Sequence, residues 1–347
     1  MAQSWLEIVK RTEPNSADMK PIGIAGIGSY VAPKVMTNQD WTKYVDTSDE
    51  WIYSKTGIRE RRIADPNVAT SDLAAEASRR AMADAGINAE DVDLIVLATS
   101  SPDVPLSATA CIVQYKLGAR NAAALDINNV CSDFIYGLDI GWKMAAADTY
   151  QNVLVIGAET YSRILNWKDR TTCVFFGDGA GAVVLKECKK GQGLLASTLY
   201  SDGSGHKVIE IPAGGSRIPT THETLEKGLN YLFMDGKAVW DFATVRFPEA
   251  VRNVVAKAGY SLDDVDLIVP HQSNINIIRK SMEVLGLPME KAYSHLQIYG
   301  NMAGASVPVA LDMAFKEGRV KRGDLIVICG YCGGLAWGAN AIRWNKS

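Results

Sequence analysis

The segment "EASRRAMADAGINAEDVDLIV" at residues 76–96 returns as "EAVRNVVAKAGYSLDDVDLIV" at residues 249–269. The two align without gaps, with 12 identities in 21 positions, and the offset between them is half of this 347-residue chain. "DVDLIV" alone is a common way for a strand to begin, but here the match runs through a whole helix, loop and strand. The sequence therefore predicts an internal duplication: two similar α/β halves packed face to face about a pseudo-two-fold axis.

Apolar, β-branched runs alternate with helical patterns along both halves of the chain. The runs are "IGIAGIG", "DLIVLATS", "AALDINN" and "NVLVIGAE" in the first half, and "DLIVPH" and "DLIVICG" in the second. Such alternation is typical of α/β proteins, whose strands are buried on both faces. We predict a polar extension at residues 1–20, a first half at 21–190 and a second half at 191–347.

The composition excludes several classes of protein. Apolar residues make up 47% and charged residues 22% of the chain, and the net charge is -3, as in ordinary folded enzymes. No run of like charges suggests a nucleic-acid partner, and no apolar run has the length of a signal peptide or a membrane span. We expect a cytoplasmic protein whose six cysteines are free thiols.

The stretch "NNVCSDFIYGLDIG" (128–141) places Cys131 between an apolar run and a predicted helix. Unpaired backbone N–H groups and the positive end of the dipole at a helix start lower the pKa of a thiol and favour the nucleophilic thiolate. A packed, inert thiol is the alternative, and position alone does not decide between them.

Two further polar residues follow predicted strands in the second half. His271 comes directly after "DLIVP", and Asn301 follows a glycine before the helical stretch "GASVPVALDMAFKEG". Each has an ordinary alternative as a turn or N-cap residue. The half-chain offset carries Cys131 to position 304, beside Asn301, so the predicted duplication would bring all three strand ends together.

The motif "CGYC" (329–332) offers a rival chemistry, because a C-x-x-C pair is found in redox and zinc sites. Zinc would need a second pair, which the sequence lacks. A thioredoxin-like site would need a helix to start at once, whereas glycines and a strand follow. A thiol-disulfide oxidoreductase using Cys329 and Cys332 is therefore kept only as an alternative of another class.

Taken together, "VCSDFIYGL", "VPHQSN", "YGNMAGASVPVAL", "FGDGAGAVVL" and "GGLAWG" resemble the β-ketoacyl-acyl-carrier-protein synthase III family. "DTSDEWIYSKTGIRERRIA" (46–64) matches the same family, and the resemblance covers residues 21 to 345 in family order. It implies the thiolase fold, a duplicated five-layer αβαβα arrangement with two five-stranded sheets, in a homodimer.

The resemblance also implies a reaction. Cys131 would take the acyl group of an acyl-CoA, and His271 and Asn301 would stabilise the enolate formed when a malonyl thioester loses CO2. Backbone N–H groups of Cys131 and Gly334 would hold the oxyanion. The product is a 3-oxoacyl thioester, with coenzyme A thioester as substrate and neither metal nor redox cofactor.

The family's substrate-binding positions carry over as follows. The expected CoA-binding residues are Thr47, Trp51, Lys55, Arg170, Gly236, Trp240 and Asn274. Trp51 and Arg170 would clamp the adenine, although Trp51 and Trp240 have the alternative of being core aromatics. Leu106 takes the position that reaches across the dimer to the acyl pocket.

Two departures from the family pattern matter. Asp133 replaces a glycine next to the nucleophile, and we expect its side chain to point away from the site, since a facing carboxylate would raise the thiol pKa. Acyl carrier protein is acidic, yet the positions that would meet it are Asp241, Asn276 and Glu283, with Arg279 and Lys280 as possible substitutes.

Three other stretches, "YSRILNWKDRTT", "PAGGSRIP" and "LNYLFMDG", are similar to the branch that makes acetoacetyl-CoA from malonyl-CoA. Malonyl-acyl-carrier protein is the expected acceptor, with malonyl-CoA as the alternative.

Overall fold

The computed structural model describes residues 19–347, so most of the predicted extension at residues 1–20 lies outside the described residues. Two large sheets form the body. The first has the order β1-β7-β6-β4-β5 and the second the order β11-β12-β13-β8. Their strands are β1 (Ile22–Val31), β4 (Leu94–Ala98), β5 (Ala123–Ile127), β6 (Val153–Thr160), β7 (Asp178–Glu187), β8 (Gly193–Ser201), β11 (Leu267–Pro270), β12 (Leu325–Cys332) and β13 (Ala336–Arg343).

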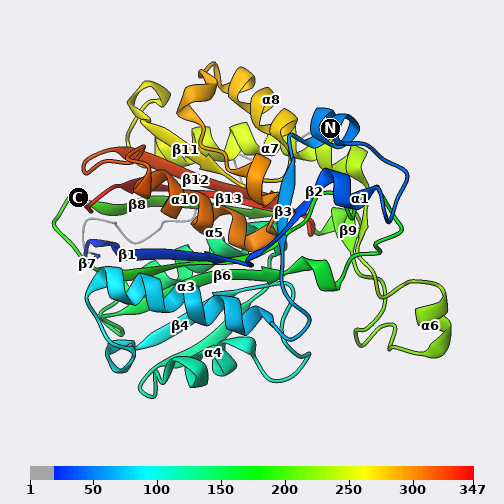
Figure 1. The fold of residues 1–347 in the computed structure, drawn as a ribbon. Helices are drawn as coiled ribbons and strands as arrows, with labels where there is room; N and C mark the ends of the chain where they lie inside the picture. The colour runs from blue at the N-terminus through cyan, green and yellow to red at the C-terminus, as the bar shows by residue number, and fades with distance from the viewer. Residues whose placement is uncertain (1–18) are drawn as a thin grey trace.

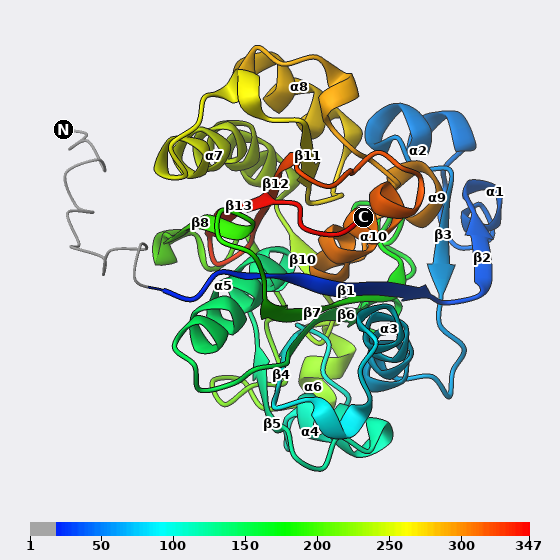
Figure 2. The ribbon, with the colours of Figure 1, turned by 90° about the vertical axis from the view of Figure 1, so that its left-hand side faces the viewer.

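The helices cover these sheets in layers (Figures 1 and 2). α5 (Asp133–Ala146) and α10 (Ser306–Lys316) lie between the two sheets and pack on both. α3 (Thr70–Ala85) and α4 (Thr109–Leu117) cover the outer face of the first sheet, and α7 (Gly236–Lys257) and α8 (Ile275–Leu285) cover that of the second. The predicted five-layer αβαβα fold is confirmed.

Shorter elements complete the described chain. Two small hairpin-like sheets pair β2 (Lys34–Thr37) with β3 (Glu60–Ile63) and β9 (Ile209–Glu210) with β10 (Phe233–Met234). The remaining helices are α1 (Asn38–Trp41), α2 (Asp49–Thr56), α6 (His222–Glu226) and α9 (Leu296–Tyr299). The predicted boundary between the halves at residue 190 falls in the connection from β7 to β8.

The structure explains why "DVDLIV" occurs twice. Asp91 and Asp264 each accept the backbone N–H of the residue three positions earlier, at 2.8 Å, and so close a capped turn before the strand. Asp93 and Asp266 each accept a backbone N–H at the start of the neighbouring strand, at 2.9 and 2.8 Å. The first aspartate ends the loop and the second fixes the register of β4 on β6 and of β11 on β12.

The duplication extends to the turns in front of the two inner helices. A 3-10 turn at Val130–Ser132 precedes α5, and one at Ala303–Ala305 precedes α10. Val130 and Ala303, which the half-chain offset relates to each other, both have positive φ angles, 51° and 41°, which non-glycine residues rarely adopt. These turns contact each other, so the starts of α5 and α10 meet at the centre of the molecule.

Within residues 19–347 the second sheet has four strands and not the five that the family resemblance implied. Only one parallel bridge, Ile268 to Ala292, stands where β5 pairs in the first half. The buried side chain of Gln272 forms hydrogen bonds with the backbone of the residues that follow Ala292. Its Nε2 donates to the Tyr293 carbonyl at 3.2 Å, and its Oε1 accepts the His295 N–H at 3.1 Å. A side chain therefore replaces a strand at this edge.

Candidate active site

A small cavity of about 30 Å³ lies where the two halves meet. Its lining comes from both halves and consists of Val130, Cys131, Tyr161, Phe176, Ile209, Met234, Val239, His271, Ser273, Asn301, Tyr331 and Cys332. The structure thus brings together Cys131, His271 and Asn301, which are far apart in the sequence. The wall around them is largely apolar and aromatic, which strengthens electrostatic interactions inside.

Cys131 sits in the 3-10 turn that leads into α5 and is 6% exposed. The positive φ of Val130 makes the chain turn sharply and presents the thiol to the cavity. Burial raises the pKa of the Cys131 thiol well above its ordinary value, and the Cys332 thiol, Glu159 and Asp133 raise it further. The expectation that the helix start lowers this pKa is wrong for the structure as it stands, because desolvation prevails.

His271 follows β11 and is held through its backbone N–H, which donates to the Cys329 carbonyl at 2.8 Å. Its ring lies edge-on to Tyr331, with 5.5 Å between the ring centroids. Burial, and secondarily His295, lowers the pKa of His271 to about 3. The imidazole is therefore neutral at physiological pH and offers one N–H donor, not a positive charge.

Asn301 has a fixed amide orientation. Its Oδ1 accepts the backbone N–H of Ala303 at 2.8 Å, inside the turn before α10. Its backbone bridges to the first half, where the Asn301 N–H donates to the Phe175 carbonyl at 2.9 Å. Because the amide oxygen is occupied in this way, the Nδ2 group is the part of the side chain left to donate to a bound oxygen.

Gly334 does not reach the cavity. It lies in an exposed turn after β12 with φ of 129° and is absent from the lining. Gly333 is buried instead, and a Cβ on it would lie 2.7 Å from the Cβ of Ile209, a lining residue. The glycine pair was recognisable in the sequence, but which of the two faces the site depends on the local path of the turn.

Asp133 does not line the cavity, as expected, but it is close enough to contribute to the raised pKa of Cys131, which was not expected. Its carboxylate lies over Gly304, where a Cβ would be only 2.0 Å from Oδ1. Both carboxylate oxygens are buried and have no partner among the described residues. Burial and the neighbouring Glu159 raise the pKa of Asp133 well above its ordinary value, so the group favours its neutral form.

Glu159, at the end of β6, was not singled out in the sequence. Ser100 and Ser101 donate to its carboxylate, the backbone amide of Ser100 at 3.2 Å and its hydroxyl at 2.9 Å. Burial raises the pKa of Glu159 to about 7 in spite of these donors. In the sequence, Glu159 is an ordinary residue at the end of the strand pattern "NVLVIGAE". Only its buried position near Cys131 in the structure indicates that it affects the site.

Trp51 and Arg170, the two residues expected to clamp the adenine, lie against each other. The guanidinium of Arg170 lies 5.0 Å from the centre of the Trp51 ring and donates to the Asp46 carbonyl at 2.9 Å. Trp51 is half-buried on the surface and not a core aromatic. Thr47 lies in the same segment with a buried Oγ1 that has no partner among the described residues. Lys55 is exposed at the end of α2.

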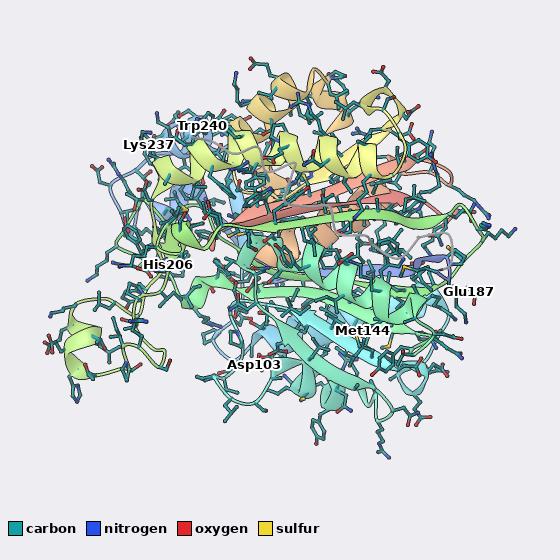
Figure 3. The ribbon with its side chains drawn as sticks, turned by 180° about the vertical axis from the view of Figure 1, so that it is seen from behind. Asp103, Met144, Glu187, His206, Lys237 and Trp240 are labelled. Carbon is teal, nitrogen blue, oxygen red and sulfur yellow. The ribbon has the colours of Figure 1, made fainter. Side chains whose placement is uncertain are left out.

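The other three expected CoA-binding residues lie at the starts of two helices. Gly236 opens α7 with free space around it, and Trp240, 38% exposed, follows one turn later (Figure 3). Asn274 caps α8 through its Oδ1, and its Nδ2 donates to the Lys55 carbonyl at 2.9 Å. Asn274 therefore joins α8 to α2, a structural function that the sequence did not indicate.

Leu106 lies in the loop between β4 and α4 and is 91% exposed, far more than is usual for leucine. It is not part of the lining of its own chain's cavity. This placement is compatible with contact to another molecule.

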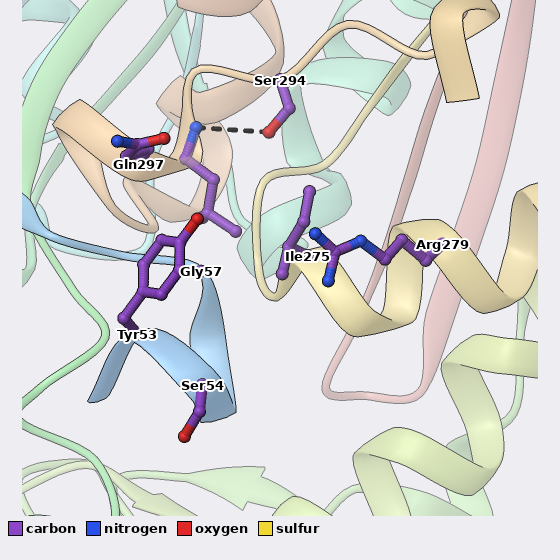
Figure 4. A pocket seen from close by; sticks show the side chains of 8 residues that line it. Tyr53, Ser54, Gly57, Ile275, Arg279, Ser294 and Gln297 are labelled. Carbon is purple, nitrogen blue, oxygen red and sulfur yellow. Dashed lines mark hydrogen bonds between the residues drawn. The ribbon is translucent and has the colours of Figure 1, made fainter. Parts of the chain in front are cut away.

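A larger cavity of about 250 Å³ lies outside the site, between α2, α8 and α9 (Figure 4). It is lined by Tyr53, Ser54, Gly57, Ile275, Arg279, Ser294, Leu296 and Gln297. It contains none of the predicted catalytic residues. The volume of a cavity therefore does not identify the candidate site. The smaller cavity is the candidate because Cys131, His271 and Asn301 line it.

Two statements on ligands and membranes hold for residues 19–347. No three His, Cys, Asp or Glu side chains in this part of the chain are grouped so that they would hold a metal ion. Within the same residues, no helix combines the length and the apolar character needed to cross a bilayer.

A duplicated five-layer α/β fold with cysteine, histidine and asparagine meeting between its halves defines a thiolase-fold condensing enzyme. Models of 3-oxoacyl-[acyl-carrier-protein] synthase III match residues 125–203 and, for the C-terminal part, 255–344. The β-ketoacyl-[acyl-carrier-protein] synthase III of Caldanaerobacter subterraneus subsp. tengcongensis is 51% identical over 93% of this chain and 98% of that protein. The chain belongs to the β-ketoacyl-acyl-carrier-protein synthase III family and is an acyltransferase.

Solved structures agree. The 3-oxoacyl-[acyl-carrier-protein] synthase III of Aquifex aeolicus VF5 superimposes with a TM-score of 0.86 at 41% identity, covering 93% of this chain and all of that one. The priming β-ketosynthase of the R1128 polyketide pathway gives a TM-score of 0.88 at 28% identity, with 94% and 97% covered.

Proposed function

We propose that Cys131, His271 and Asn301 carry out a decarboxylative condensation of an acyl-CoA with malonyl-acyl-carrier protein, giving a 3-oxoacyl thioester. The observation that supports this most is their meeting in one small cavity. In the first step the Cys131 sulfur attacks the acyl-CoA carbonyl, the C–S bond to CoA breaks, and CoA leaves with the thiol proton. The acyl group is then held as a thioester on Cys131.

In the second step the malonyl thioester oxygen accepts hydrogen bonds from the neutral His271 ring and the Asn301 amide. Loss of CO2 leaves an electron pair on the adjacent carbon, as an enolate whose oxygen these donors stabilise. That carbon attacks the acyl-Cys131 carbonyl, and the Cys131 sulfur leaves. A neutral histidine suits this role because donation, not proton abstraction, is required.

The oxyanion formed at Cys131 needs backbone donors. We place the Cys131 N–H in this role, together with an N–H from the glycine pair after Cys332. Gly333 is the better candidate, since it is buried beside the cavity and Gly334 is exposed.

The experiment separates the two half-reactions. Incubation with short acyl-CoAs is expected to add one acyl group to the peptide containing Cys131, as measured by mass spectrometry. Release of CO2 from malonyl thioester is expected to persist in part in Cys131→Ala but to fall about 100-fold or more in His271→Ala and Asn301→Ala. His222→Ala, a surface histidine, is the matched control. Undiminished CO2 release by His271→Ala would contradict the assignment.

The choice of acceptor depends on surface charge. Asp241 is paired with Lys237, and Lys280 with Glu283 at 2.9 Å. Arg279 makes only a long hydrogen bond to Asn276, at 3.4 Å, and no ion pair among the described residues. Arg279 is therefore a basic group on α8 that is available to the acidic carrier protein.

This acceptor assignment is tested with Arg279→Glu, for which we expect KM for malonyl-carrier protein to rise about tenfold and KM for malonyl-CoA to stay unchanged. Arg322→Glu makes the same charge change and serves as control, because Arg322 precedes the N-terminal end of β12 and the site lies at the C-terminal end. Malonyl-CoA used faster than malonyl-carrier protein by the unaltered enzyme would favour the acetoacetyl-CoA-forming alternative.

The exposed Leu106 supports a further part of the proposal, namely that the enzyme works as a homodimer in which this loop reaches the partner's acyl pocket. The use of CoA and carrier-protein thioesters also fits the expected cytoplasmic location.

A further inference from the structure

The "CGYC" motif does not form a redox pair with itself. Alternate residues of β12 face opposite sides of the second sheet: Cys329 packs in the outer core with α7 and α8, whereas Cys332 packs in the inner cluster that contains Cys131. Three residues apart on one strand, these two thiols lie on opposite faces. The partner of Cys332 must therefore be sought across the cavity.

That partner is the nucleophile. The Cys332 and Cys131 side chains belong to the same buried cluster and line the same cavity, and Cys332 raises the pKa of the Cys131 thiol. The closeness has a backbone cause. Gly330 is on the same face of β12 as Cys332, and a Cβ there would be 3.0 Å from the Cα of Ser132 and 3.2 Å from the Cys131 carbonyl oxygen. The missing side chain lets β12 approach the nucleophile's turn directly.

We propose that Cys131 and Cys332 form a dithiol that hydrogen peroxide converts into a disulfide, a modification that reversibly blocks the nucleophile. The loss of activity rests on the proposed role of Cys131, whereas formation of the disulfide does not. All six cysteines are free in the reduced chain, so both thiols are available. Closure requires the two sulfurs to approach to about 2.05 Å.

The chemistry balances in two steps. The Cys131 sulfur attacks one peroxide oxygen, an S–O bond forms, the O–O bond breaks, and hydroxide leaves with the thiol proton as water. The Cys332 sulfur then attacks the Cys131 sulfur, an S–S bond forms, the S–O bond breaks, and a second water leaves with the Cys332 proton. Two thiols are oxidised by two electrons and one peroxide is reduced to two waters.

The size of the oxidant and the electrostatics of the cavity set the conditions. Hydrogen peroxide is a small two-electron oxidant, so it is suited to reach two thiols that are both buried. Burial raises the pKa of the Cys131 thiol, so little thiolate is present at neutral pH. Oxidation is therefore expected to be slow at pH 7 and to accelerate about tenfold per pH unit while the pH stays below that pKa.

The test uses the full-length enzyme treated with hydrogen peroxide, quenched with an alkylating reagent and digested without reduction. We expect a cross-linked peptide pair joining Cys131 to Cys332, about 2 Da lighter than the sum of its parts, and activity that returns on adding dithiothreitol. Cys329→Ala is the matched control and is expected to give the same cross-link. Prior acylation by an acyl-CoA should prevent the cross-link by capping Cys131.

Cys332→Ala removes the second thiol. We expect its Cys131 to proceed to the sulfinic acid, about 32 Da heavier, with loss of activity that dithiothreitol does not restore. A Cys329–Cys332 cross-link would overturn the proposal. So would oxidation of Cys131 to the sulfinic acid in the unaltered enzyme. Peptide mapping of the unaltered chain decides this even if the variant misfolds. A cross-link without any acyl adduct would instead refute the proposed function alone.

Discussion

The contact between Asp133 and Gly304 permits a quantitative prediction. An alanine at position 304 would place its Cβ 2.0 Å from the Asp133 Oδ1, whereas ordinary contacts begin at 3.4 Å. The turn carrying Gly304 and the start of α5 would have to separate by the difference between these two distances, or the carboxylate would have to turn elsewhere. Both residues are fully buried, so neither can move freely. Overpacking of this kind costs about 1–3 kcal/mol.

The same displacement disturbs catalysis, because Gly304 lies three residues after Asn301 and Asp133 two residues after Cys131. A misplacement of about 1 Å between reacting groups costs about 100-fold in rate. We therefore expect Gly304→Ala to lower the melting temperature by several degrees and kcat by about 100-fold, as measured by thermal unfolding and by CO2-coupled condensation.

The double variant Asp133→Gly/Gly304→Ala supplies the decisive comparison. Removing the carboxylate makes room for the new methyl group, so most of the lost activity and stability should return. Gly215→Ala is the control, because a Cβ there meets nothing within 4 Å. The reasoning is refuted if Gly304→Ala behaves like the unaltered enzyme, or if the double variant is as impaired as the single one.

Three further outcomes are expected. The pKa of Glu159 is raised from 4.5 to about 7, which contributes at most about 3 kcal/mol of stability that is fully present below pH 4.5 and is lost as the pH rises through 7. Glu159→Gln should therefore make the melting temperature depend less on pH between pH 5 and 8. An unchanged pH dependence of the melting temperature would contradict this. Trp51→Ala and Arg170→Ala should each raise KM for acyl-CoA about tenfold with kcat nearly constant, and a fall in kcat alone would argue against an adenine clamp. If the proposed homodimer forms through Leu106, Leu106→Glu should yield a monomer in size-exclusion chromatography with light scattering, and an unchanged dimer would contradict this role of Leu106.

Much of the fold followed from local chemistry. The repeated "DVDLIV" predicted two equivalent strands because each aspartate makes a local hydrogen bond. The first aspartate closes a turn and the second holds the next strand, so the same residues recur at both places. The turns around Cys131 and position 304 also followed from the half-chain offset. In contrast, a fifth strand was expected in the second sheet, and the described part of the chain forms four there, since Gln272 satisfies the backbone by side-chain hydrogen bonds that no sequence pattern predicts.

Some properties of the site were likewise predictable from the sequence, and others were found only in the structure. Cys131, His271 and Asn301 could be named because strand ends in a duplicated α/β fold converge, and the family motifs select these residue types. The family resemblance implied Gly334 as an oxyanion donor, and only the structure shows that Gly333 is the buried glycine of the pair. The raised pKa of Cys131 was missed because helix position is a local property, whereas desolvation depends on everything packed around the thiol.

The sequence by itself determined the duplication, the α/β layers, the family and the three residues proposed for catalysis, because periodicity, capping and motif order are written along the chain. Only the tertiary structure decided which groups meet across it: Asp133 over Gly304, Glu159 behind the nucleophile, and Cys332 beside Cys131 but not beside Cys329. These contacts join residues that lie far apart in the sequence. Their distances depend on the packing of two halves through close approaches at Gly304 and Gly330, which residue order does not encode locally.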